Sequence, residues 1–209
     1  MNRSTATALR AAGIALSISG ILTACTVFPV PEAPRVMDLP VPQALKTNTT
    51  SRPESLRIDT PRASNPYNSS RILAKPQPWE FRVYGGVRWR DSVPVLLQDM
   101  LAGAFRASAS FQHVAIDSGP GNTDLNLATE IIAFHAVTHS DSTRVTIEVF
   151  GQLVDSRSQK TLCSNSFTVS KPAGNTNIDE VVLAFGTAGD QLADEIIAWA
   201  KNCNAAPPG

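Results

Sequence analysis

The sequence predicts an α+β fold, with a mainly antiparallel sheet and two amphipathic helices packed on one face of that sheet. Stretches that alternate apolar and polar residues, as strands do, occur in two groups, one before residue 90 and one between residues 111 and 169. A stretch with apolar residues three and four positions apart, as in helices, follows each group. Strands and helices therefore do not alternate one for one, which argues against a doubly wound parallel fold.

Short strands are expected first. Residues 56–58, 71–73 and 80–84 are short stretches of strand-forming character, and the third alternates cleanly with period two. Gly85-Gly86 then predicts a turn or bulge, and residues 87–89 continue as a further strand beyond it.

A first helix is expected after these strands. Asp91 and Ser92 precede Pro94, and proline is favoured in the first turn of a helix. The apolar positions that follow recur at helical spacing, and they are Val93, Leu96, Leu97, Met100, Leu101, Ala104 and Phe105. This pattern predicts an amphipathic helix that packs on the sheet.

The second half predicts an antiparallel meander and a final helix. Strands are expected at residues 111–116, 125–137, 144–154 and 160–169, and short polar turns join the last three. Asn175-Thr176-Asn177 offers an N-cap for a helix that runs to about Asn202. Its apolar stripe consists of Ile178, Val181, Val182, Phe185, Leu192, Ile196 and Trp199. Gly186 and Gly189 predict a close approach of this helix to the sheet.

The N-terminus has the pattern of an exported protein. Arg3 and Arg10 accompany an uncharged apolar segment, residues 11–22, which is too short to span a bilayer as a mature helix. Leu22-Thr23-Ala24-Cys25 resembles the bacterial lipoprotein signal, which implies cleavage before Cys25 and the attachment of diacylglycerol and an acyl chain to that cysteine. Apart from these covalently attached lipids, no cofactor is expected. The alternative is an ordinary secretory signal with a chance cysteine.

This pattern divides the chain into four parts. Residues 1–24 are the expected signal peptide, 25–54 a tether, 55–203 the folded domain and 204–209 a flexible tail. Six prolines lie between Thr26 and Glu54, so no continuous helix can form there. Such a tether reaches at most ~90 Å when extended as polyproline. A short edge strand at residues 36–39 is an alternative for part of it.

Charge and cysteines narrow the class of protein further. Without residues 1–24, the chain has 16 basic and 18 acidic residues, because two of the 18 basic residues are removed. This balance gives no basic face for nucleic acid. Export and the use of Cys25 for lipid leave Cys163 and Cys203 as a candidate disulfide, with two free thiols as the alternative. The disulfide would close a loop of about 40 residues, for which the chain-entropy model gives a stabilisation of ~4 kcal/mol.

No constellation of catalytic or metal-binding residues stands out. His135 and His139 have a spacing that suits a metal only on a helix, whereas the pattern there predicts a strand that enters a turn. No Gly-x-Ser-x-Gly nucleophile elbow and no Gly-Lys-Ser/Thr phosphate loop occurs. We therefore expect neither catalysis nor a metal site.

Arginines alternate with apolar residues on the expected early strands. These arginines, which alternation should place opposite the core, are Arg57, Arg71, Arg82, Arg88 and Arg90. Arg82 and Arg88, with Trp89, are the candidate interface for an acidic partner or lipid headgroups. The alternatives are a solvated sheet face for the arginines and a core position for Trp89.

The segment 81–105, a strand, Gly-Gly, a strand that ends in Trp89 and a proline-containing amphipathic helix, resembles the ABC-type transport auxiliary lipoprotein family. The resemblance extends over about residues 36–199. In the family the first strand lies close to the anchor and carries an aromatic residue and leucines, whereas here Val36-Met37-Asp38-Leu39 lies in a proline-rich segment. Thr26, where aspartate would signal retention, implies sorting to the outer membrane.

The resemblance implies a non-enzymatic lipoprotein on the periplasmic face of the outer membrane. It would work with an ABC transporter and a lipid-carrying MCE protein in transport between membranes. The alternative function is an outer-membrane assembly or secretion-structure lipoprotein. Antiparallel edge strands also make a homo-oligomer a possible partner arrangement.

Overall fold

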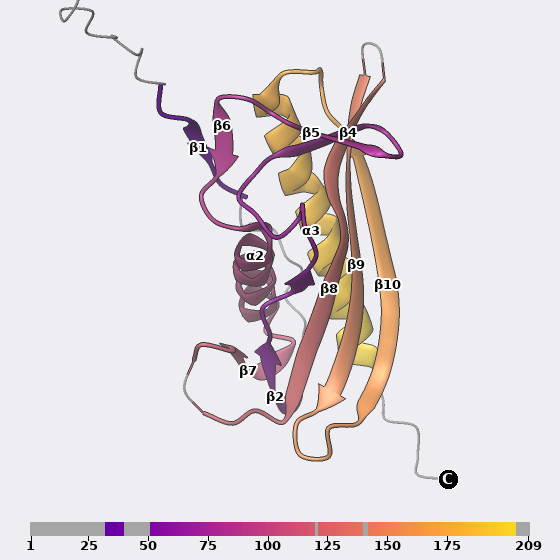
Figure 1. The fold of residues 1–209 in the computed structure, drawn as a ribbon. Coiled ribbons are helices and arrows are strands. Elements are labelled where there is room, and N and C mark those ends of the chain that lie inside the picture. Colours follow the sequence, from indigo (N-terminus) through magenta and orange to yellow (C-terminus); the bar gives the residue numbers. More distant parts are fainter. Residues whose placement is uncertain (1–31, 40–50, 120, 140–141, 204–209) are drawn as a thin grey trace, which may run out of the picture. The chain divides into compact units, whose positions relative to one another are not determined.

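The structure is a computed structural model that describes residues 32–39, 51–119, 121–139 and 142–203 (Figure 1). The helices and strands in these ranges all belong to one compact unit, Pro34–Gly209. Its elements in chain order are β1 (Arg35–Met37), β2 (Arg52–Ile58), β3 (Arg62–Ala63), β4 (Leu73–Gln77), β5 (Glu80–Val83), β6 (Val87–Trp89), α2 (Val93–Ser108), β7 (Phe111–Ile116), β8 (Leu125–His139), β9 (Ser142–Asp155), β10 (Thr161–Pro172) and α3 (Ile178–Asn202).

The main sheet contains both parallel and antiparallel strand pairs, so the prediction of a mainly antiparallel sheet was wrong. Five of its strands lie in the order β10-β9-β8-β2-β7, and β8, β9 and β10 form the antiparallel meander. Strand β2, however, runs parallel to both β7 and β8. The chain passes through α2 between β2 and β7, and such a crossover connects parallel strands. Alternation within a short segment predicts a strand but does not specify the direction of its partner.

The long strands β8 and β9 carry much of the core. Before a bulge at residues 131–133 of β8, the side chains of Leu125, Leu127 and Ile131 are buried. After it, Phe134 pairs with Ile147 and enters the core, and the ring of Phe134 stacks on Phe185 of α3 at 4.8 Å. The extra residue reverses the alternation, and His135 therefore faces away from α3.

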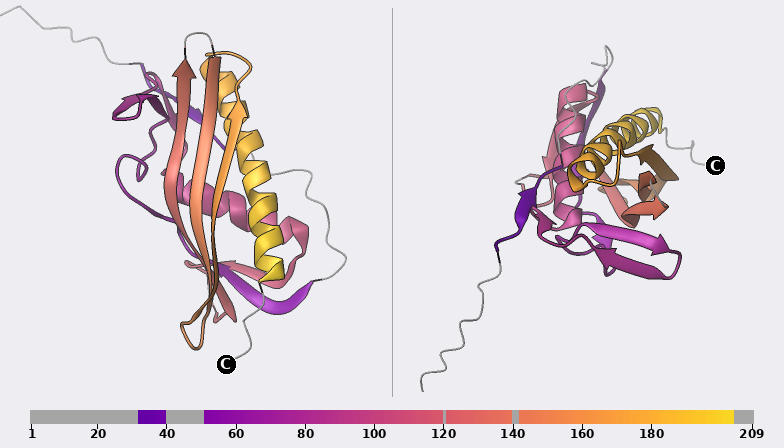
Figure 2. Two further views of the ribbon diagram at one scale, coloured as in Figure 1. Left: turned by 90° about the vertical axis from the view of Figure 1, so that its right-hand side faces the viewer. Right: turned by 90° about the horizontal axis from the view of Figure 1, so that it is seen from above.

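Helix α3 runs along β9 and β10 and also contacts α2 (Figure 2). The side chain of Asn177 accepts a hydrogen bond from the backbone N–H of Asp179 and caps the helix, as the sequence indicated. Gly189 faces α2 rather than the sheet: a Cβ added there would lie 2.6 Å from Met100 Sδ and 4.0 Å from Leu39. The close approach predicted at this glycine is therefore between the two helices.

Part of the segment expected to be a tether is a strand. Strand β1 pairs in parallel with β6 as a separate two-stranded sheet. Directly after it, Leu39 is buried with 4% of its surface exposed. Arg35 forms an ion pair with Asp179 at the start of α3, at 2.7 Å. Residues 35–39 are thus part of the folded domain.

No helix in the described part of the chain is long and apolar enough to cross a membrane.

Candidate interaction surface

A β-hairpin formed by β4 and β5 presents the most exposed large apolar side chain in the described part of the chain. Its two strands are joined by the two-residue turn Pro78-Trp79, and we name residues 73–83 the aromatic hairpin. Trp79 is 82% exposed, and Val83 and Phe81 are 48% and 39% exposed. Tryptophan is usually largely buried, so an indole held in solvent at a turn marks a candidate contact point.

A small aromatic cluster attaches this hairpin to the sheet. The ring of Phe81 makes edge contacts with the rings of Tyr67 and His135, at centroid distances of 5.6 and 6.1 Å. The Tyr67 hydroxyl and His135 Nδ1 share a hydrogen bond of 2.8 Å. Lys75 Nζ lies over the Phe81 ring, 5.2 Å from its centroid. These contacts fix the base of the hairpin, while its turn stays exposed.

The cluster is electrically neutral at pH 7 apart from Lys75. Burial, with a smaller contribution from the charge of Lys75, lowers the pKa of His135 to about 4. Burial also raises the pKa of Tyr67 to about 12. Beside the cluster is a cleft of about 320 Å³, lined by Lys75, Pro76, Gln77, Pro78 and Val137.

The arginines singled out in the sequence make contacts within the protein. Arg82 pairs with Glu80 at 2.7 Å, and its side chain is 68% exposed. Arg88 donates to the backbone oxygens of Trp89 and Arg90. Arg90 bridges two carboxylates, Asp38 and Asp99, each at 2.6 Å. Arg82 therefore remains the most accessible of these three cations, whereas Arg90 is neutralised by its partners.

Trp89 is a core residue, which corrects its assignment to the candidate interface. Its side chain is 0% exposed, and its ring makes edge contacts with Phe134 at 6.0 Å and Phe185 at 5.5 Å. Alternation on β6 puts Val87 and Trp89 on the buried side and Arg88 on the other. A side chain with no accessible surface cannot anchor a partner in this state.

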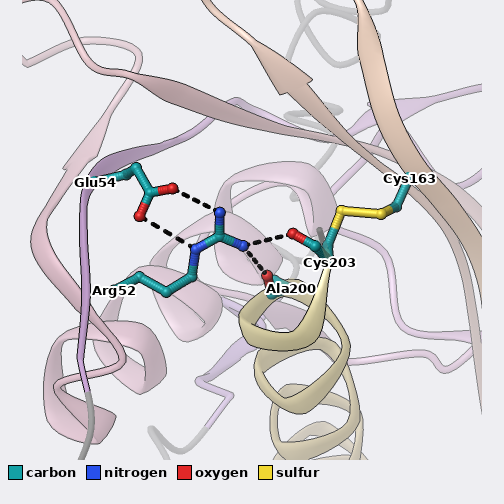
Figure 3. The surroundings of a disulfide bond; sticks show 5 residues. All are labelled: Arg52, Glu54, Cys163, Ala200 and Cys203. Atoms are coloured by element: carbon teal, nitrogen blue, oxygen red, sulfur yellow. Dashed lines mark hydrogen bonds and ion pairs between the residues drawn. A yellow bond between two sulfur atoms is a disulfide. The ribbon is translucent and has the colours of Figure 1, made fainter. Parts of the chain in front are cut away.

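The two cysteines of the domain form a disulfide at the end of α3 (Figure 3). Cys163 on β10 and Cys203 have Cα atoms 6.1 Å apart. Beside the bond, Arg52 Nη1 donates to the carbonyl oxygens of Ala200 and Cys203, at 3.0 and 2.7 Å. Glu54 accepts from the other side of the same guanidinium, at 2.7 and 3.3 Å. This network ties β2, α3 and β10 together.

The remaining site predictions concern metals and the N-terminal region. His135 is buried on β8, and no group of three potential metal ligands occurs within the described ranges. The predicted signal peptide, Cys25, most of the expected tether and the tail at 204–209 lie outside the described residues.

Trp79 was not singled out from the sequence. A signal was present, because Pro76-Gln77-Pro78-Trp79 directly precedes the expected strand at 80–84. Proline before an aromatic residue, between two strand-like segments, indicates a turn that exposes the aromatic ring. The expected strand at 71–73 overlaps β4 only at Leu73, so the two arms of the hairpin were not recognised as a pair.

The mixed sheet, the two helices and the small parallel sheet of β1 and β6 define an α+β domain. The model for the ABC-type transport auxiliary lipoprotein component matches residues 38–197, and this chain belongs to that family. No curated protein matches the sequence.

Solved structures share this fold. The crystal structure of protein XCC0632 from Xanthomonas campestris is 27% identical, covers 79% of this chain and 94% of its own, and has a TM-score of 0.71. The crystal structure of an uncharacterised protein is 12% identical, covers 81% of this chain and 99% of its own, and has a TM-score of 0.62.

Proposed function

We propose that this protein is a non-catalytic accessory lipoprotein of an ABC-type system that carries lipid between membranes with an MCE-domain partner. The observation that supports this best is the match of residues 38–197 to the transport auxiliary family. The sequence Leu22-Thr23-Ala24-Cys25 supplies the lipid attachment that such a lipoprotein requires. We place the anchor in the outer membrane and the domain on its periplasmic face.

The proposed mechanism is tethering of a docking domain. Cys25 lies ten residues before Arg35, where β1 begins, and ten residues span at most about 35 Å when extended. This reach is much shorter than that of a tether that continues to residue 54. This short tether, the leash between Cys25 and Arg35, keeps the domain close to the bilayer. It thereby raises the effective concentration of the domain for a partner at that surface.

Arg82 and Arg88 remain the proposed contact with the partner. Arg82 is 68% exposed, and Arg88 lies on the accessible side of β6. An acidic surface on the partner would compete with Glu80 for Arg82. Charged groups of this kind influence association rate and specificity more than affinity.

Site-specific photo-cross-linking in cells tests the proposed partner. A photoreactive residue at Arg82 is expected to capture an MCE-domain protein, whereas one at Lys160, an exposed position in the β9–β10 turn, is not. Recovery of a barrel-assembly or secretion component at Arg82 would overturn the proposal. The double variant R82E/R88E should reduce co-purification of the partner. R62E, at a side chain that is 80% exposed and faces an acidic group, is the matched control.

The anchor needs a separate measurement. Mass spectrometry of the N-terminal peptide from membranes should find Cys25 with a diacylglycerol group and an acyl chain. Cys25→Ser should release the domain into the soluble fraction. An unmodified thiol at Cys25 in membrane-extracted protein would contradict this part of the proposal.

A further inference from the structure

The turn of the aromatic hairpin has the chemistry of a bilayer contact. Trp79 is 82% exposed and follows Pro78, whose ring restricts the backbone of the turn. The indole has an apolar body and one N–H donor, and tryptophan accumulates where one side of a residue is in lipid and the other in water. Lys75, on the neighbouring strand, adds a cation that suits anionic headgroups.

The aromatic hairpin lies at the same end of the domain as β1. In Figure 1 and in the left view of Figure 2, β1 and the aromatic hairpin are both near the upper end, while the β9–β10 turn is at the lower end. Cys25 precedes β1 by ten residues. An anchor on that cysteine would therefore hold the hairpin end nearer to the bilayer than the opposite end.

The size of the exposed feature favours a membrane over a protein partner. Stable protein interfaces bury about 800 Å² on each partner, whereas a two-residue turn offers little more than one indole. Such a small contact is weak when it acts alone. On a leash of at most about 35 Å, however, the effective concentration of bilayer is high, and a weak contact suffices to orient the domain.

We infer that Trp79 inserts its indole into the headgroup region of the bilayer that carries the lipid on Cys25, and that this contact orients the domain. The inference rests on the proposed anchor at Cys25. It adds a second point of attachment, which restricts the rotation of the domain and leaves Arg82 and Arg88 with a defined orientation toward the partner.

Fluorescence on vesicles tests this contact without depending on cellular acylation. Cys25 is the only cysteine outside the disulfide, so its thiol in the chain from residue 25 onward can be coupled to a maleimide lipid. The vesicles contain phosphatidylethanolamine and phosphatidylglycerol, with or without bromine on the acyl chains. We expect brominated vesicles to quench tryptophan emission of the wild-type domain, and the W79F variant to lose this quenching. Trp89 is fully buried, and Trp199 packs on Phe167, so both contribute background only.

The matched control moves the indole to the other end of the domain. The double variant W79F/K160W places it on the exposed β9–β10 turn, where no quenching is expected. The inference is overturned if the coupled wild-type protein is not quenched, or if W79F/K160W is quenched equally. Failure of cells to acylate Cys25 would instead contradict the proposed function, and the mass measurement detects that failure independently. A photoreactive residue at position 79 that captures a protein rather than lipid would likewise overturn the membrane contact.

Discussion

At the scale of single residues, Arg52 has the largest structural role that the sequence pattern concealed. It lies in the proline-containing segment expected to be a tether, yet it begins β2, and its side chain is only 16% exposed. Its guanidinium donates to the carbonyl oxygen of Ala200 in the last turn of α3, which also accepts from the Cys203 amide, and to the carbonyl oxygen of Cys203 directly after the helix. It also lies 5.5 Å from the ring centroid of Phe111.

Arg52→Ala should therefore destabilise the domain by about 2 kcal/mol, since hydrogen bonds to a charged group contribute about 1.5–3 kcal/mol. Urea unfolding followed by circular dichroism measures this loss. Arg62→Ala is the matched control, because that side chain is 80% exposed and its partner Glu130 is 3.4 Å away. Equal midpoints for the two variants would show that the Arg52 network does not stabilise the fold.

At the scale of elements, attachment of the aromatic hairpin depends on a histidine that is neutral when folded. His135 is buried between Tyr67 and Phe81, and Lys75 is the nearby cation that disfavours its protonation. Across the cluster, the charge of Glu148 contributes to the raised pKa of Tyr67. An uncharged imidazole is the form that this site accepts.

Stability should consequently fall as the pH falls below 6.5. The pKa of His135 is 6.5 in the unfolded chain and about 4 in the folded chain. Between these two pH values the unfolded state binds the proton more readily, so lowering the pH favours unfolding. Between pH 7 and pH 5 the expected loss is about 2 kcal/mol. His135→Gln keeps a hydrogen-bond acceptor for Tyr67 but does not titrate, and unfolding curves at the two pH values should show a smaller loss for this variant. An unchanged pH dependence in His135→Gln would exclude His135 as the source.

The disulfide acts on two elements, β10 and α3. It closes a loop with a sequence separation of 40 residues, for which the chain-entropy model gives about 4 kcal/mol. The double variant C163S/C203S should unfold at a correspondingly lower urea concentration. Reductant should lower the wild-type midpoint toward that of the variant and leave the variant unchanged. A wild-type midpoint that does not respond to reductant under unfolding conditions would contradict a stabilising bond.

At the scale of the whole molecule, β1 determines how far the domain could move from the anchor proposed at Cys25. The Arg35 amide donates to the Gly86 carbonyl, and the Arg90 amide donates to the Met37 carbonyl. Leu39 is buried next to Gly189 of α3. If β1 detached, the free chain would extend from Cys25 to Arg52, and its maximum reach would rise from about 35 Å to about 90 Å.

Leu39→Ser should detach β1, because burial of a leucine contributes about 1.5–3 kcal/mol. We expect faster tryptic cleavage after Arg35 and faster hydrogen exchange of the Arg90 amide in this variant. Val36→Ser is the control, since Val36 is 54% exposed and its removal leaves the buried contact intact. Equal cleavage rates in the two variants would show that burial of Leu39 does not keep β1 attached to the domain.

Features that depend on neighbouring residues could be predicted from the sequence, whereas features that depend on distant segments could not. Helix α2, helix α3 and the strands of the meander were predicted close to their observed positions, because each is defined by its own periodicity and end signals such as Asn177. The bulge in β8 and the parallel partners of β2 were not predicted, and the sequence left two alternatives for Trp89, a partner interface and the core. Each of these depends on which distant segment lies alongside, and no local pattern encodes that.

The sequence by itself determined the family, the expected lipid attachment and the helices and long strands, because these depend on residue type and spacing along the chain. Only the tertiary structure decided that the sheet is mixed, that Arg52 caps a distant helix, that β1 belongs to the folded domain and that Trp79 rather than Trp89 is exposed. The physical reason is that burial and hydrogen-bond partners arise from contacts between segments far apart in the chain. Two tryptophans ten residues apart therefore have opposite environments, one packed against Phe134 and Phe185 and the other in solvent at a turn.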